Sequence, residues 1–142
     1  MKEVTLPTWL AESPFVRFAL VGGAGFIADS GVFVTAHYLL QFDVMLSRLL
    51  AFFCAACVTW LGNRVFTFAS QSRDKWSEWG RFMVSACLSA LPNFAVFTLV
   101  LQGVGENDGA PLLALVLGVL AGMVSNYWLS KHWVFQRRGA RM

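Results

Sequence analysis

The sequence has little charge for its length: Asp, Glu, Lys and Arg make up 13% of its 142 residues. A soluble domain usually carries about twice that fraction. The mean hydropathy of +0.60 points the same way. The composition therefore argues against a water-soluble globular domain, and the formal net charge of +3 calls for no nucleic-acid partner.

Groups that carry catalysis are also scarce. There are only two histidines, His37 and His132, and they lie far apart in the chain. Paired carboxylates, a nucleophile motif and a metal-ligand cluster are all missing from the sequence. A phosphate-binding loop of the GxxxxGK[ST] type is also missing, which argues against direct use of ATP. We therefore expect neither an enzyme nor a bound cofactor.

Cysteine is rare as well, with three in the chain. Cys54 and Cys57 have the spacing of a redox CxxC motif, but they lie in an apolar run with no cation nearby to stabilise a thiolate. We interpret them as packing residues.

Long apolar runs are what the sequence does contain. Four of them cover roughly Phe15–Leu40, Leu46–Phe68, Phe82–Leu101 and Leu112–Phe135. Each holds about 20 residues or more, which is enough for a helix to cross the hydrocarbon core of a membrane. The runs are too long for barrel strands and do not alternate with period two. The first is too long for a cleavable signal sequence. The sequence therefore predicts an all-α integral membrane protein with four transmembrane helices.

The placement of Lys and Arg predicts the orientation. The loop between the first and second spans and the loop between the third and fourth spans hold only Arg48. The N-terminal segment, the middle loop and the C-terminal tail, with the adjoining helix ends, hold ten cations. Because Lys and Arg accumulate in short cytoplasmic segments, both termini are predicted to be cytoplasmic. The ten cations are Lys2, Arg17, Arg64, Arg73, Lys75, Arg81, Lys131, Arg137, Arg138 and Arg141.

The two halves of the chain align with each other. Arg17-Phe18 matches Arg81-Phe82 at an offset of 64 positions, and Asp29 matches Asn93. The second helices align at an offset of 67, and their endings Arg64–Phe68 and Lys131–Phe135 correspond. With two crossings each, the halves enter the membrane from the same side, so they form parallel repeats. The predicted single domain 1–142 comprises repeat one at 15–68, a cytoplasmic loop at 69–80, repeat two at 81–135 and a cytoplasmic tail at 136–142.

Small and polar residues share one face of each predicted helix, four positions apart. Small residues such as Gly25, Gly118 and Gly122 allow close helix packing. Asp29 lies 12 residues after Arg17, or about 18 Å along a helix, near the middle of the membrane. A carboxylate there is costly and usually faces a cavity, a partner or a proton path. The alternative is structural hydrogen bonding to Thr59, Asn63 or Asn126.

The matched cations near the helix ends suggest a second polar site. Arg64 follows Asn63, and Lys131 follows Ser130, so each half places a cation beside an amide or a hydroxyl. Such a cluster suits a lipid phosphate, because arginine grips it through two donors and lysine acts as a point charge. The simpler alternative is that both cations reach out to the membrane interface.

These residues also carry a resemblance to a known family. Phe15–Gly23, Asp29, Phe33 and Asn63–Phe68 resemble the first half of the GtrA-like family, and Asn126–Phe135 is similar to the ending of its second half. The resemblance implies a bacterial inner-membrane protein that moves a polyprenyl-phosphate-linked sugar, such as undecaprenyl-phosphate glucose, to the outer leaflet. A separate glycosyltransferase would then use the sugar for cell-surface polysaccharide. Relatives among the membrane subunits of dolichol-phosphate mannose synthase imply an alternative, an accessory anchor for such a glycosyltransferase.

The leading hypothesis is a flippase in which the cations hold the phosphodiester, buried polar groups bind the sugar, and aromatic residues pack on the sugar or the lipid chain. Four short helices enclose little volume, so we expect a homodimer or a higher oligomer. A further alternative is a proton-coupled multidrug exporter that uses Asp29. The residues predicted to bind substrate are Arg17, Asp29, Asn63, Arg64, Phe66, Arg81, Asn93, Asn126, Lys131 and Trp133.

Overall fold

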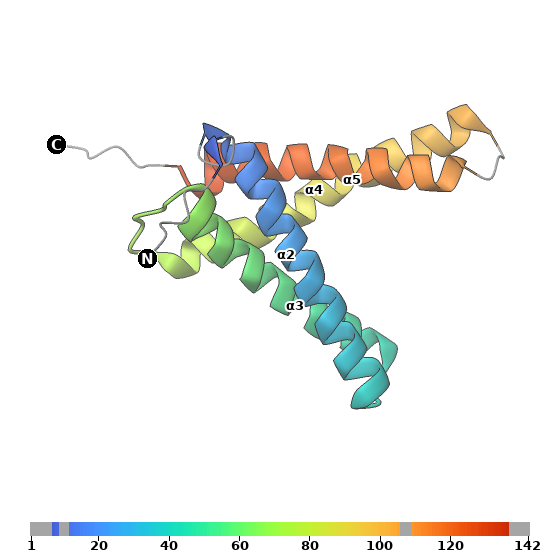
Figure 1. The fold of residues 1–142 in the computed structure, drawn as a ribbon, viewed down its shortest axis with the longest axis horizontal. Coiled ribbons are helices and arrows are strands. Elements are labelled where there is room, and N and C mark those ends of the chain that lie inside the picture. The colour runs from blue at the N-terminus through green and yellow to red at the C-terminus, as the bar shows by residue number, and fades with distance from the viewer. Residues whose placement is uncertain (1–6, 9–11, 106–108, 137–142) are drawn as a thin grey trace. The chain divides into compact units, whose positions relative to one another are not determined.

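The computed structural model describes residues 7–8, 12–105 and 109–136 (Figure 1). Throughout these residues the regular structure is helical, as the sequence predicts. Four of the ten cations counted in the sequence lie outside the described ranges. They are Lys2, Arg137, Arg138 and Arg141.

The chain divides into two compact units, residues 1–71 and 72–142. The first unit is a helical hairpin (Figure 1). Its first helix is capped by Ser13, whose hydroxyl accepts a hydrogen bond from the amide of Val16 at 3.4 Å. Pro14 occupies the first helical position. Its second helix is capped by Asp43, whose carboxylate accepts a hydrogen bond from the amide of Met45 at 2.9 Å. In order, its elements are α2 (Pro14–Val34), η1 (Thr35–Leu39), α3 (Val44–Gly62) and η2 (Asn63–Thr67), of which η1 and η2 are π-helical.

The second unit is also a helical hairpin (Figure 1), formed by α4 (Lys75–Val104), α5 (Ala110–Leu129) and the π-helical η3 (Ser130–Val134). Helix α4 begins seven residues before the expected Phe82, inside the segment 69–80 predicted as a loop. The reason is a capping signal: the Asp74 carboxylate accepts from the amide of Ser77 at 3.1 Å. Helix α4 continues through Pro92 and ends before Gly105, whose φ is 76°.

Four helical segments within the described residues are long and apolar enough to cross a membrane, which confirms the predicted number and type. They are Pro14–Leu39, Val44–Thr67, Lys75–Val104 and Ala110–Val134. Large apolar side chains cover their outer surfaces: Ile27 is 73% exposed and Phe94 is 70% exposed. Such exposure would be costly in water. It is the arrangement expected where the surroundings are lipid.

The small residues lie where the two helices of a hairpin meet. A Cβ placed on Gly118 would come within 2.8 Å of the backbone oxygen of Asn93, and one on Gly122 within 3.1 Å of the backbone oxygen of Ser89. In the first unit, a Cβ on Gly25 would collide with the methyl group of Thr59. The small-residue faces therefore allow close backbone contact, as their spacing predicts.

Replacing Gly118 by alanine should destabilise the second unit. The new methyl group would meet a backbone oxygen, which cannot rotate away, and overpacking of this kind costs about 1–3 kcal/mol. Thermal unfolding in detergent measures the effect. Gly23→Ala is the control, because nothing lies within 4 Å of its added Cβ. Equal stability of the two variants would contradict the packing described here.

Candidate phosphate-binding ends of the two units

The second helix of each unit ends in a π-helical turn. These turns, Asn63–Thr67 and Ser130–Val134, are separated by the same 67 positions that align the two halves in sequence. They are closed by bonds from the amide of Phe68 to the oxygen of Asn63 at 2.9 Å, and from Phe135 to Ser130 at 2.8 Å. Turns of this type are rare and occur frequently at functional sites. The matched endings are therefore the first place to look for chemistry.

Each ending holds a cation over an aromatic ring one helical turn earlier. The guanidinium carbon of Arg64 lies 5.9 Å from the centre of the Trp60 ring, and Lys131 Nζ lies 5.9 Å from the centre of the Tyr127 ring. Attraction between a cation and a ring face contributes about 0.5–2 kcal/mol and limits where the charge can move. The two cations differ in access, since Arg64 is only 9% exposed and Lys131 is exposed.

In each unit, an arginine of the first helix donates a hydrogen bond to a backbone oxygen at the end of the second helix. In unit 1, Arg17 Nη1 donates to the backbone oxygen of Phe66 at 3.2 Å, and its guanidinium lies 5.9 Å from the Phe66 ring centre. In unit 2, Arg81 Nη2 donates to the oxygen of Val134 at 3.4 Å. The Nε atoms of both arginines are buried and find no acceptor among the described residues. Arg17 and Arg81 therefore have a structural task at the predicted site.

The polar residues that precede the cations are deeply buried. Asn63 is 1% exposed, and its side-chain oxygen accepts from the Thr67 hydroxyl at 2.8 Å. Ser130 holds the matched place in unit 2 and is fully buried, and its hydroxyl has no partner among the described residues. An unpaired buried hydroxyl is costly. The Ser130 hydroxyl is thus an unpaired hydrogen-bonding group in the residue before Lys131.

Two further amides predicted to bind substrate lie along the α4–α5 contact. The side-chain oxygen of Asn126 accepts from the Ser85 hydroxyl at 2.9 Å. Asn93 packs against Gly118 and Gly122. Both amides are half-buried. They form the polar lining that the sequence predicts for this helix pair, and their contacts also hold the hairpin together.

The aromatic residues of the endings divide into two kinds. Phe68 packs edge-on against Phe18 with ring centres 6.3 Å apart, and Phe135 packs against Phe82 in a tilted arrangement with ring centres 6.1 Å apart. These pairs close the hairpins. The two predicted substrate contacts differ, because Phe66 is 38% exposed and Trp133 is 41% exposed. Only these two present a substantial ring surface to an apolar ligand.

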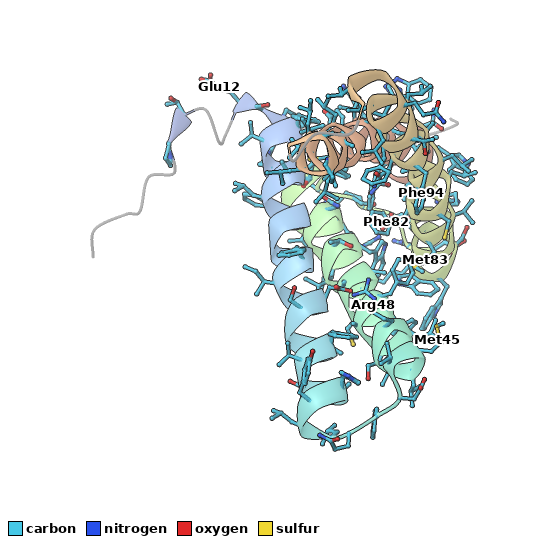
Figure 2. The ribbon with its side chains drawn as sticks, turned by 90° about the vertical axis from the view of Figure 1, so that its right-hand side faces the viewer. Glu12, Met45, Arg48, Phe82, Met83 and Phe94 are labelled. Carbon is cyan, nitrogen blue, oxygen red and sulfur yellow. The ribbon has the colours of Figure 1, made fainter. Side chains whose placement is uncertain are left out.

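Asp29 has a partner that the sequence interpretation did not consider. Its carboxylate accepts from Arg48 Nη1 at 3.1 Å (Figure 2 shows Arg48 between α2 and α3). Neither Thr59 nor Asn63, two of the proposed partners, bonds to it: Thr59 donates to the oxygen of Ala55 within its own helix. The charge count assigned Arg48 to an outer loop, whereas Arg48 lies within α3, which begins at Val44 behind the Asp43 cap. Its place inside the predicted apolar run was the available signal.

Four membrane-length helices, paired in hairpins with matched cationic ends, define a small multi-pass membrane protein. A family model described as the GtrA/DPMS transmembrane domain matches residues 17–135. The chain therefore belongs to the GtrA/DPMS transmembrane domain family, as the sequence resemblance indicated. No curated protein matches the chain. Within the described residues, no group of three or more His, Cys, Asp and Glu side chains is placed to hold a metal ion.

Replacing Arg17 by methionine should loosen the π-helical end of unit 1. The variant loses a charge-assisted hydrogen bond, which is typically worth about 1.5–3 kcal/mol. Hydrogen exchange of the amides at 63–68 should accelerate by about tenfold, which corresponds to 1.4 kcal/mol. Arg81→Met is the matched control and should accelerate exchange at 130–135 instead. Unchanged exchange in both segments would show that the arginines do not hold these ends.

Proposed function

We propose that this protein moves a polyprenyl-phosphate-linked monosaccharide from the cytoplasmic to the outer leaflet of the bacterial inner membrane. Undecaprenyl-phosphate glucose represents the class, and a separate glycosyltransferase would use the sugar for cell-surface polysaccharide. The observation that carries the proposal is the repeated ending, a cation held over an aromatic ring beside a buried polar group. Family membership supports it.

The phosphodiester binds at the cationic endings. Lys131 is exposed, so it makes the first contact with the incoming anion. At the ending of unit 1, Arg64 is nearly buried and offers a guanidinium whose paired donors match phosphate oxygens. The unpaired hydroxyl of Ser130 gains an acceptor when the anion binds. Neutralising the phosphate in this way lowers the cost of bringing it toward hydrocarbon.

The sugar requires hydrogen-bond partners during the crossing, because an unpaired hydroxyl in an apolar medium costs several kcal/mol. Asn126 and Asn93 offer amides along one helix pair, and Asn63 offers another at the end of α3. Phe66 and Trp133 present exposed ring surface to the sugar face or to the isoprenoid chain. The polyprenyl tail stays in the bilayer, so the protein need only shield the head group.

The proposed orientation places the cationic endings in the cytoplasm. It follows from the positive-inside rule and from ten cations against one. In this orientation each hairpin presents its ending to the leaflet in which the sugar lipid is made. The small enclosed volume of a four-helix chain favours a homodimer or a higher oligomer as the working form.

The family description, which joins GtrA with DPMS, favours one other function. In that alternative the protein is an accessory membrane subunit that anchors a polyprenyl-phosphate glycosyltransferase. Co-expression with the glycosyltransferase separates the two. An anchor changes the membrane attachment or the turnover of the enzyme, whereas a flippase leaves both unchanged and alters only the leaflet in which the product accumulates.

The structure weighs against a proton-coupled exporter of cationic drugs. Such a site needs a carboxylate that is available to a cation, and the Asp29 carboxylate is already held by Arg48 at 3.1 Å. A drug would have to displace an internal guanidinium.

Reversing the charge of Lys131 should remove most transport. In vesicles containing fluorescently labelled polyprenyl-phosphate glucose, Lys131→Glu should lower the leaflet-exchange rate by at least about tenfold, because one unit charge contact is replaced by repulsion. Insertion should be unaffected, and thermal stability should fall only by the small contribution of the contact with Tyr127, since the side chain is exposed. Arg73→Glu, at an exposed cation outside the endings, is the matched control and should keep the wild-type rate. Wild-type exchange by Lys131→Glu would refute the role of the endings.

A further inference from the structure

Among the described residues of unit 1, Asp29 and Arg48 form a salt bridge that the function above does not use. It joins the two helices of the hairpin, and its two side chains are unequally exposed, 55% for Arg48 and 21% for Asp29. The guanidinium carbon of Arg48 also lies 5.6 Å from the centre of the Phe33 ring, which stacks in turn on His37. A charged pair at membrane depth is costly and usually has a functional reason.

A purely structural role, in which the ion pair holds the two helices together, does not account for its presence. At the aligned positions unit 2 has Asn93 in place of Asp29 and Leu115 in place of Arg48. That hairpin nevertheless packs its helices through the same small-residue face. The fold therefore forms without an ion pair here, and the charges of unit 1 are available for another purpose.

The ion pair holds the Arg48 side chain deeper in the hairpin than expected for an arginine near the start of a helix. Arg48 follows the start of α3 by four residues, about 6 Å, whereas Asp29 precedes the end of the first span by ten residues, about 15 Å. The guanidinium thus reaches toward the middle of the hairpin. Helical side chains tilt toward the helix N-terminus, and an arginine near a span end extends to the interface. Freed from Asp29, Arg48 would move toward the hairpin end, residues 39–44.

The guanidinium also has unused binding capacity. Arginine has five N–H donors in a fork that fits phosphate oxygens. Among the described residues, Arg48 makes one hydrogen bond, through Nη1 to Asp29. Nη2 and Nε are left for a ligand, and more than half of the side chain is exposed. Phe33 supplies an aromatic surface beside it.

We propose that Arg48 is a second phosphate-binding residue, and that Asp29 is an internal anion which holds Arg48 until the phosphodiester of the sugar lipid displaces it. The proposal rests on the flippase function. Arg48 and Arg64 are 16 residues apart on the same helical span, about 24 Å. That distance approaches the thickness of the hydrocarbon core. The endings receive the phosphate at one face, and Arg48 receives it toward the other.

Binding measurements test this inference without requiring transport. The probes are geranyl-phosphate glucose, a short-chain phosphodiester, and inorganic phosphate, titrated calorimetrically into purified protein carrying Lys131→Gln to weaken the first site. Asp29→Asn should tighten phosphodiester binding by about fivefold, because the competing anion is gone. Arg48→Gln should weaken binding by about tenfold or more. Inorganic phosphate should bind more weakly than the phosphodiester, which also contacts Phe33.

The opposite effects of the two substitutions on binding distinguish a ligand site from an ion pair with a purely structural role. If the ion pair served only to hold the hairpin, both substitutions would weaken binding together, in step with a fall in thermal stability, and this result would overturn the proposal. The charge swap Asp29→Arg with Arg48→Asp restores the ion pair and should restore stability without restoring phosphodiester binding. Tight binding by a stable swapped variant would also overturn it.

The outcome can be distinguished from failure of the flippase function itself. If wild-type protein does not exchange lipid between leaflets but the two substitutions shift binding in opposite directions, the anion site stands and the transport function falls. If wild-type protein exchanges lipid and Arg48→Gln binds and exchanges equally well, the endings suffice and Arg48 has no part in transport.

Discussion

A backbone carbonyl that loses its helical partner near hydrocarbon must find another donor, and both units meet this constraint with an arginine from the neighbouring helix. Arg17 donates to Phe66 and Arg81 to Val134. These contacts fix the π-helical turns, and the turns carry the cations proposed to bind phosphate. The sequence interpretation placed all four cations together as substrate ligands. The structure gives two of them, Arg17 and Arg81, a positioning contact, and keeps Lys131 exposed.

Within unit 1 the charges lie at two levels. Arg64 stands at the end of the second span over Trp60, and Arg48 stands near its start, turned toward Asp29. Between Leu49 and Val58 the intervening helix carries no polar group except the thiols of Cys54 and Cys57, and the hydroxyl of Thr59 donates within its own helix. A lipid phosphate crossing this distance would leave one guanidinium and meet another. Unit 2 lacks the second level, so the two hairpins are not equivalent in charge.

The features that periodicity and composition govern were predicted well from sequence. The four spans and the close approach at Gly118 and Gly122 depend on local patterns that survive folding. The widened turns at Asn63–Thr67 and Ser130–Val134 were not predicted, because α and π turns share side-chain composition and differ in one hydrogen bond. The partner of Asp29 was missed because the charge count treated Arg48 as a loop residue, although it lies inside the predicted apolar run and inside α3.

Reconstitution of the purified wild-type protein alone is the most direct test of the central claim. Vesicles would contain polyprenyl-phosphate glucose and this protein, with no glycosyltransferase and no nucleotide, and an impermeant reagent would titrate the lipid in the outer leaflet over time. The reagent-accessible fraction should rise faster than in protein-free vesicles, in proportion to the protein added. An exchange rate equal to that of protein-free vesicles would contradict it.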